Sequence, residues 1–491
     1  MPEVVDSYGD VKIIREEGTS MLMYIIMPPK LTPEEEAIIK HPKALVSDYK
    51  EIVKKLEAYR TSAEKEDFLR KYLSVKLNER GVSSANQDKL IEMIMDDIFL
   101  GYGKIGCLMR DDNLEEIMVN GVGVPIFVVH RKYGMCMTNL RYESRNEINE
   151  IINFLSVYSG REINEKKPLL DGHMPDGSRA NIAIEPAAPH GPAITIRKFK
   201  KAPYNIIDLI ALNSISLDLA AFLWVCVEGF GLHPCDILIA GGSGSGKTTL
   251  FNALAMFIPP TERVVTVEDT LELNLEFLEN WVALEANPSV IEKTNLDMEA
   301  LVENSLRMRP DRVFVGEVRG REANTLFVAM DIGLNGSMCT IHSNNAREST
   351  IRLMHEPMNV PIRMLPLIDL IVVMNRYFDR KKGVIRRVTE VAEISGIEGD
   401  VVQLGEIYTW DLKTDKIQRT HYPILLKEKI SRWCGLDKRE LDREIYIREK
   451  VLEWMLRNNI RSNEEVIEIF QRYHINPKEI IERMKFKEND K

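Results

Sequence analysis

The segment from Gly241 to Thr248 constrains the fold of this 491-residue chain more than any other feature. Its sequence, GGSGSGKT, matches the pattern G-x-x-x-x-G-K-[ST] in full and lies between an apolar run, DILIA, and a helical run, TTLFNALAMF. Glycines in such a loop let backbone N–H groups surround phosphates, while the positive end of the following helix and Lys247 offset their charge. A flexible Gly/Ser turn is the alternative, but the flanking strand and helix favour a phosphate-binding loop. The segment therefore predicts a site for ATP and Mg²⁺.

The pattern around this loop predicts the fold class. From about residue 208, helices alternate with short apolar runs (DILIAG, RVVTVED, DRVFVGE, SMCTIH, LIDLIVVM), which is typical of a mostly parallel sheet. We therefore predict an α/β, RecA-like, doubly wound P-loop core. The expected domains are a small N-terminal domain at 1–90, an α+β second N-terminal domain at 91–200, a linker at 201–207, the ATPase domain at 208–425 and a helical C-terminal tail at 426–491. The tail is expected to lie outside the catalytic core, as exposed or partner-facing helices.

The composition of the chain argues against several classes of protein. Hydrophobic residues make up 44% and charged residues 29%, with no biased tract, so a disordered chain is excluded. The formal net charge of -10 provides no global attraction for nucleic acid. Six scattered cysteines without a C-x-x-C pair argue against a zinc site or a disulfide framework and favour the cytoplasm. The charged N-terminus does not resemble a signal peptide, and LDLAAFLWVCVEGFGL is too short to cross a bilayer.

Two glutamates follow apolar strands at the edge of the sheet where α/β proteins bind their ligands. Glu268 and Asp269 end the run VVTVED, and Glu317 ends VFVGE. A motor needs a carboxylate that orients water for attack on the γ-phosphate, so Glu268 and Glu317 are both candidate bases and candidate magnesium ligands, and the choice between them stays open. Gly316 stands where most P-loop ATPases carry a magnesium-ordering aspartate. By itself, an acidic residue after an apolar strand is more often a helix cap or a solvated strand end.

A histidine follows a further apolar run. In GLNGSMCTIHSNNA, His342 enters a polar Ser/Asn turn. A lone histidine is most often a packing residue, but imidazole can also donate a hydrogen bond to the γ-phosphate. His342 is therefore a candidate γ-phosphate sensor. The residues predicted to contact the nucleotide are Gly241, Gly242, Ser243, Gly244, Ser245, Gly246, Lys247, Thr248, Thr249 and Asp269, with Thr248, Glu268 and Glu317 as the predicted magnesium ligands.

Four motifs in this order resemble the secretion ATPase superfamily that includes GspE, PilT and the archaeal FlaI proteins. GGSGSGKT resembles its Walker A motif, VVTVEDTLEL its Asp box, RMRPDRVFVGEVRG its atypical Walker B motif and GLNGSMCTIHSNNA its histidine box. Upstream, LEEIMVNG, PIFVVHRKYG and DGSRANI resemble the PAS-like second N-terminal domain of archaeal members. By this resemblance, Arg179 and Arg197 match family arginines that reach the phosphates as further catalytic residues; a surface salt bridge is the alternative for either.

The chain also departs from the superfamily's pattern at two places. Leu334 follows Gly333 where many members carry a second histidine, so a mechanism with two histidines is not expected. The cysteines cannot supply the four-cysteine zinc module of bacterial GspE proteins, so no zinc is expected.

The resemblance implies an ATP hydrolase that forms a homohexameric ring at the inner face of the cell membrane. A polytopic membrane platform protein would be its partner, and pilin-like subunits or secreted proteins would be moved indirectly. A DNA-transfer or helicase-type motor is the alternative, against which the acidic balance counts. A nucleotide-dependent scaffold without hydrolysis is a third possibility, in which Glu268 and Glu317 would be dispensable.

Overall fold

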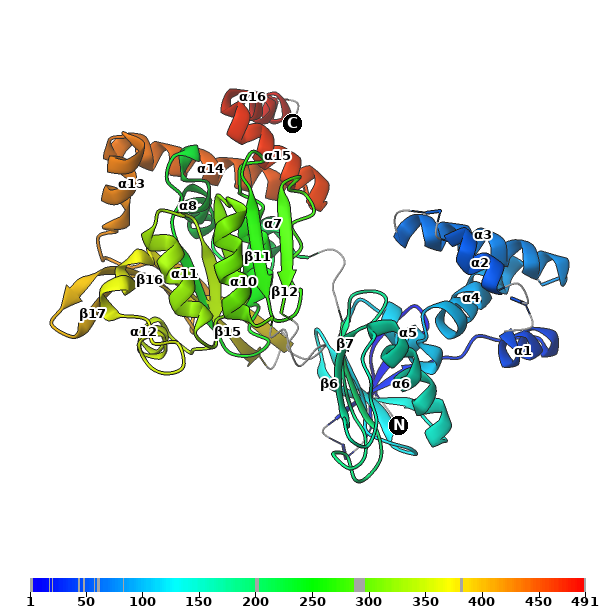
Figure 1. Cartoon of the computed structure of the whole chain (residues 1–491). Helices are drawn as coiled ribbons and strands as arrows, with labels where there is room; N and C mark the ends of the chain where they lie inside the picture. Colours follow the sequence, from blue (N-terminus) through cyan, green and yellow to red (C-terminus); the bar gives the residue numbers. More distant parts are fainter. Residues whose placement is uncertain are drawn as a thin grey trace. The chain divides into compact units, whose positions relative to one another are not determined.

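The computed structural model describes residues 3–16, 18–19, 21–42, 45–46, 49–56, 58–59, 62–82, 84–198, 203–286, 296–379 and 383–489. The chain divides into two compact units, Met1–Lys200 and Lys201–Lys491 (Figure 1). Of the predicted linker at 201–207, residues 201 and 202 lie outside the described residues.

The first unit is built on a nine-stranded sheet with the order β1-β2-β3-β6-β5-β4-β9-β8-β7. Most neighbours pair antiparallel, but β3 pairs parallel with β6, placing Leu22 opposite Cys136. The strands are β1 (Glu3–Tyr8), β2 (Val11–Arg15), β3 (Leu22–Ile26), β4 (Leu114–Val119), β5 (Pro125–His130), β6 (Gly134–Arg141), β7 (Leu169–His173), β8 (Arg179–Ala183) and β9 (Ala193–Arg197). Strands β5 and β6 form an antiparallel hairpin in the segment PIFVVHRKYGMCMT.

The sheet crosses the predicted boundary near residue 90. Strands β1 to β3 belong to it because alternate residues, Val11, Ile13 and Tyr24, bury their side chains in the same apolar core as β4 to β9. Helices α1 to α4 form a separate cluster around Leu73 and Leu77, so only this helical segment is distinct within the first ninety-odd residues. The helices of the unit are α1 (Pro33–Lys40), α2 (Tyr49–Leu56), α3 (Ser62–Glu79), α4 (Ser84–Ile94), α5 (Gly106–Arg110) and α6 (Arg145–Ser159).

The second unit contains a nine-stranded sheet with the order β12-β11-β13-β14-β10-β15-β16-β17-β18. Strands β10 to β15 run parallel, whereas β16, β17 and β18 continue the sheet antiparallel from β15. The strands are β10 (Ile237–Gly241), β11 (Val264–Glu268), β12 (Trp281–Glu285), β13 (Arg312–Val315), β14 (Met338–Ile341), β15 (Leu370–Asp379), β16 (Gly383–Glu398), β17 (Val401–Asp411) and β18 (Lys416–Arg419).

Helices cover both faces of this sheet. Along β10, Ile237 and Ile239 face the core under α7, α8 and α9, whereas Leu238 and Ala240 face the core under α10, α11 and α12. Both faces are apolar, which is why the strands read as continuous hydrophobic runs. This architecture confirms the predicted RecA-like α/β core. The helices are α7 (Ile206–Ala211), α8 (Leu217–Glu228), α9 (Lys247–Ala255), α10 (Met298–Ser305), α11 (Glu322–Asp331) and α12 (Ala346–Met354).

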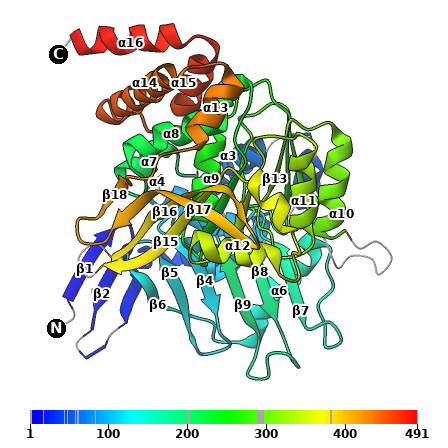
Figure 2. The same cartoon turned by 90° about the vertical axis from the view of Figure 1, so that its left-hand side faces the viewer.

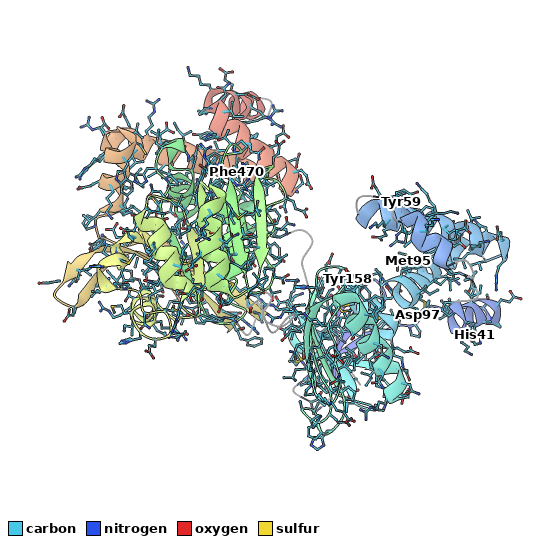
Figure 3. The ribbon with its side chains drawn as sticks, viewed as in Figure 1. His41, Tyr59, Met95, Asp97, Tyr158 and Phe470 are labelled. Atoms are coloured by element: carbon cyan, nitrogen blue, oxygen red, sulfur yellow. The ribbon has the colours of Figure 1, made fainter. Side chains whose placement is uncertain are left out.

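The C-terminal tail is helical, as predicted, but the prediction that it lies outside the core is wrong. Its apolar side chains, among them Leu441, Val451 and Leu452, share one core with α8 and α9, and α14 runs along α8 (Figure 2). Phe470, labelled in Figure 3, packs edge-on against Trp224 of α8 with ring centroids 4.7 Å apart. The tail helices are α13 (Leu426–Cys434), α14 (Lys438–Arg457), α15 (Asn463–Ile475) and α16 (Pro477–Asn489).

Helix α8 is the apolar segment LDLAAFLWVCVE. It is buried on nearly every side because the sheet covers one flank and the tail covers the other. Within the described part of the chain, no helix combines the length and apolar character that a membrane crossing requires.

Candidate functional site

The predicted phosphate-binding loop links β10 to α9. Gly244 and Gly246 have φ angles of +66° and +101°, which side chains other than glycine rarely adopt. A Cβ atom at Gly241 would lie 2.3 Å from the carbonyl oxygen of Met374, so this glycine is required by space. Helix α9 then begins at Lys247 and directs its N-terminus toward the loop. The backbone therefore has the shape that a phosphate-binding loop needs.

The side chains of the loop fit a magnesium nucleotide. Lys247 is 7% exposed, and its Nζ donates to the carbonyl oxygens of Gly241 and Gly242 at 2.9 and 3.1 Å. The hydroxyl of Thr248 donates to Oε2 of Glu272 at 2.9 Å. The buried hydroxyl of Ser245 has no hydrogen-bond partner among the described residues, as expected of a polar atom that faces a ligand. An ammonium, a hydroxyl and a carboxylate thus meet where a phosphate and its metal would bind.

Glu272 was missed by the reading of the sequence. It lies four residues after Glu268 in VEDTLEL, and its own carboxylate, rather than that of Glu268, is the one in contact with Thr248. The signal was present, since the motif contains this second glutamate. Sequence spacing alone does not show which of the two turns toward the loop.

Glu268 lies deeper than the sequence suggested. It is 2% exposed, and its Oε1 accepts hydrogen bonds from the backbone N–H groups of Glu272 and Leu273 at 3.0 and 3.1 Å. Burial raises the pKa of Glu268 to about 8, against the opposing effect of these donors. In this position the carboxyl fixes the turn that presents Glu272 to Thr248.

Gly316 explains the departure from the usual Walker B sequence. A Cβ atom at this position would lie 2.8 Å from Cγ of Glu268. An aspartate at 316 would therefore displace Glu268, and the two side chains cannot both occupy this space. The chain has a deep glutamate from β11 in place of an aspartate from β13.

Glu317 and His342 are brought together at the carboxyl ends of β13 and β14. Oε1 of Glu317 accepts a hydrogen bond from Nε of Arg319 at 2.6 Å and lies 3.2 Å from Nε2 of His342. Arg319 also lies 3.7 Å from the carboxylate of Asp269. Burial tends to raise the pKa of Glu317, but the hydrogen bond and charge of Arg319, with smaller effects of His342 and Lys247, hold it below the ordinary value. The carboxylate is therefore ionised at neutral pH.

His342 is held in the neutral form. Burial and then the charge of Lys247 lower its pKa, against the opposing charge of Glu317. Its side chain is 36% exposed. Together with Glu317 and Arg319 it lines a cavity of about 500 Å³ whose other wall is formed by the end of α12 and residues 355–358. A neutral imidazole with access to this space can donate or accept a hydrogen bond.

Arg179 and Arg197 belong to the first unit. They lie directly opposite each other where β8 pairs with β9. Arg179 also lies 3.6 Å from Asp171 in an ion pair that is partly exposed. The structure thus brings the two predicted arginines together as a pair, and their contact with nucleotide stays a prediction.

A phosphate-binding loop, a lysine and a threonine at its end, and a carboxylate beside a histidine at the same sheet edge define a P-loop ATPase. The profile of the family described as "Type II/IV secretion system protein" matches residues 103–376, and the chain belongs to this family. The predicted resemblance is thereby confirmed.

Three relatives illustrate its place in the family. MJ0900 of Methanocaldococcus jannaschii is 30% identical over 96% of this chain and 89% of its own length. MJ0781 of the same organism is 46% identical over 50% of this chain, a match that spans only 35% of that protein. The conjugal transfer protein TrbB of Rhizobium radiobacter is 30% identical over 60% of this chain and 89% of its own length.

Proposed function

We propose that this protein is a ring-forming ATPase motor, a homohexamer, that powers the assembly of type IV pilus-like filaments or protein secretion through a membrane platform protein. The observation that carries the proposal is the meeting of Glu317 and His342 at the phosphate-loop edge of the sheet, in a chain of the type II/IV secretion family. A scaffold without hydrolysis would have no use for an ionised carboxylate there.

The residues of the phosphate-binding loop and the side chains beside it have separate roles in hydrolysis. Backbone N–H groups and Lys247 would bind the phosphates, and Thr248 with Glu272 would hold a magnesium ion, which would offset the nucleotide's charge. Glu317 is the base that orients the attacking water, because its carboxylate is ionised and borders a cavity. Glu268 is a positioning residue, since it is buried and accepts hydrogen bonds from the backbone N–H groups of Glu272 and Leu273. His342 senses the γ-phosphate.

Arg179 and Arg197 couple hydrolysis to movement in this proposal. Guanidinium groups bind phosphate oxygens through paired hydrogen bonds, so a pair of them on the first unit is suited to close over the nucleotide. Their directly opposed positions on β8 and β9 allow both to act on the same ligand. Closing and opening would then move the first unit against the second during each cycle.

The motor is proposed to work at the cytoplasmic face of the membrane, held there by its platform partner, with pilin-like subunits as the indirect cargo. A DNA-transfer motor is the alternative, favoured by the similarity to a conjugal transfer protein. The formal net charge of -10 counts against direct tracking on DNA.

An ATPase assay tests the proposal and separates the alternatives. Phosphate release by the full chain is measured alone, with acidic-lipid vesicles and with DNA, over a range of salt concentrations. A secretion motor is expected to respond to the vesicles, whereas a DNA motor would respond to DNA with a steep salt dependence. Lys247→Ala is the matched control and should lose useful nucleotide affinity, because Lys247 is the loop's only cationic side chain. Undiminished turnover by Lys247→Ala would refute the site.

A further inference from the structure

The hairpin of β15 and β16 borders the phosphate-binding loop on the side away from Glu317 and His342. In the sheet, β10 lies between β14 and β15, so the strands that carry His342 and Glu317 are on one flank and the hairpin is on the other. Met374 of β15 is in close contact with the loop: its carbonyl oxygen limits the space at Gly241, and its Cε would lie 3.2 Å from a Cβ atom at Gly246. The loop therefore rests on β15.

Two arginines of this hairpin reach the tip of the loop. Nε of Arg386 donates a hydrogen bond to the carbonyl oxygen of Gly244 at 2.9 Å. Arg376 lies directly opposite Arg386 in the β15–β16 ladder, and its Nη1 would be 3.2 Å from a Cβ atom at Gly244. Two guanidinium groups thus converge on one glycine of the phosphate-binding loop.

The neighbouring arginine has a different environment. Because successive residues of a strand face opposite sides of the sheet, Arg387 points away from the loop. It is buried and forms a paired ion bridge with Asp415, at 2.7 and 2.9 Å. Arg387 therefore stabilises the fold through its ion pair with Asp415, whereas Arg386 faces the nucleotide site.

The order of the strands indicates how the phosphates of the nucleotide run across the loop. The γ-phosphate must lie near Glu317 and His342, because that is where water is oriented in the proposed reaction. The remaining phosphates follow the loop toward its other flank, where the hairpin lies. We propose that Arg376 and Arg386 bind the α- and β-phosphates of the nucleotide. This inference rests on the proposed ATPase function and assigns two residues that the sequence motifs do not include.

The geometry predicts a distinct kinetic signature. ATP and ADP both carry the α- and β-phosphates, so each arginine stabilises the substrate and the product complex equally. Removing an interaction that is equal in the ground state and transition state raises KM and leaves kcat nearly unchanged. A hydrogen bond to a charged group corresponds to a loss of about 10- to 100-fold in affinity.

Binding of fluorescent ADP and of fluorescent ATPγS, both with Mg²⁺, tests the proposal in the full chain. Arg376→Ala and Arg386→Ala should each weaken both ligands by about 10- to 100-fold, with kcat at saturating ATP within about three-fold of the wild-type value. Arg386→Lys keeps the charge without the planar fork and should recover only part of the affinity. Arg419→Ala removes an exposed arginine of the same sheet and is the matched control.

Each outcome decides the question. Unchanged affinity for both nucleotides in Arg376→Ala and Arg386→Ala overturns the proposal, and so does a large loss of kcat with unchanged affinity. If Arg386→Ala does not fold, as judged by its melting temperature, Arg376→Ala and Arg386→Lys still decide. A wild-type chain that neither binds nor hydrolyses ATP would refute the proposed function itself, which is a different result.

Discussion

Two groups of charged residues in the second unit differ sharply in how they are surrounded. In the first, Arg448 of α14 and Glu228 of α8 are 3% and 5% exposed and lie 2.7 Å apart. In the second, Glu317 is 19% exposed, and its partners His342 and Arg319 are 36% and 62% exposed. Both groups contain a carboxylate, an arginine and a histidine, because His474 lies 3.1 Å from Glu228.

The two groups differ in how completely their charged side chains are enclosed by ion pairs, hydrogen bonds and aromatic rings. The guanidinium of Arg448 bonds to Glu228 and Glu444 and lies 4.9 Å from the centre of the Tyr473 ring and 5.0 Å from that of Phe230. Such a closed set of contacts fixes the tail on α8. At the carboxyl edge of the sheet, the partners of Glu317 are open to solvent and to a cavity, so a ligand can replace them. The buried network stabilises the fold, whereas the half-open one leaves its charged side chains accessible to a ligand.

The largest expected effect is a loss of folding stability when the buried network around Arg448 and Glu228 is broken. Arg448→Ala leaves Glu228 buried without its main partner, which costs about 3–5 kcal/mol of stability. Urea unfolding followed by tryptophan fluorescence measures it, since Trp224 lies beside Arg448. Arg457→Ala, which removes an exposed arginine from the same helix, should cost at most about 1 kcal/mol. Equal losses of stability in Arg448→Ala and Arg457→Ala would mean that burial does not determine how strongly the network stabilises the fold.

Glu317→Gln is expected to act on turnover and not on the fold. An amide cannot accept the proton or orient water as a carboxylate does, so kcat should fall by about 10²- to 10⁴-fold while ATP binding stays within a few-fold. Turnover, nucleotide affinity and melting temperature are compared with those of Glu268→Gln. If Glu268→Gln binds ATP without turnover and Glu317→Gln remains active, the two roles are reversed.

Gly316→Ala tests the packing between the strands that carry the two glutamates. Its new methyl group would meet Cγ of Glu268 at 2.8 Å, and overpacking of this kind costs about 1–3 kcal/mol. Urea unfolding of Gly316→Ala, Glu268→Ala and the double variant measures the coupling. Because Glu268→Ala removes the clashing atom, the double variant should lose less than the sum of the two single variants. Simple additivity would show that the clash does not exist.

The smallest expected effect is a shift in pH dependence. Arg319 lowers the pKa of Glu317, so Arg319→Ala should raise it and protonate the base at a higher pH. The acid limb of the kcat profile should then move toward higher pH, while the rate near pH 8 changes little. Arg321→Ala, a nearby exposed arginine, is the control. A shift toward lower pH would contradict the assigned interaction.

Local sequence patterns predicted the parts of the molecule that depend on neighbours in the chain. The glycine loop and the apolar parallel strands each have a local signal, and each is present. The packing of the tail has no such signal, because an amphipathic helix shows that one face is buried but not against which element. Glu228 illustrates this limit: in the sequence it only interrupts an apolar run, and its partner Arg448 comes from a distant helix.

The candidate site was predictable to a similar degree. Motif order identified the edge of the sheet where Glu317 and His342 meet. The depth of Glu268 depends on the space that Gly316 leaves on another strand, and the role of Glu272 depends on the turn that Glu268 fixes. These relations are set by contacts between strands, which spacing along one strand does not encode.

The parallel pairing of β3 with β6 bears on how the chain folds. Parallel neighbours cannot be joined by a tight turn, and here the helical segment and two further strands separate them in sequence. The β1–β3 meander can form early, but its open edge has no partner until β6 has been synthesised. An unpaired strand edge is prone to association with other chains. During translation, the edge of β3 is therefore exposed to such association until β6 pairs with it. The meander is therefore joined to the rest of its sheet only after the helical segment and strands β4 and β5 have been synthesised.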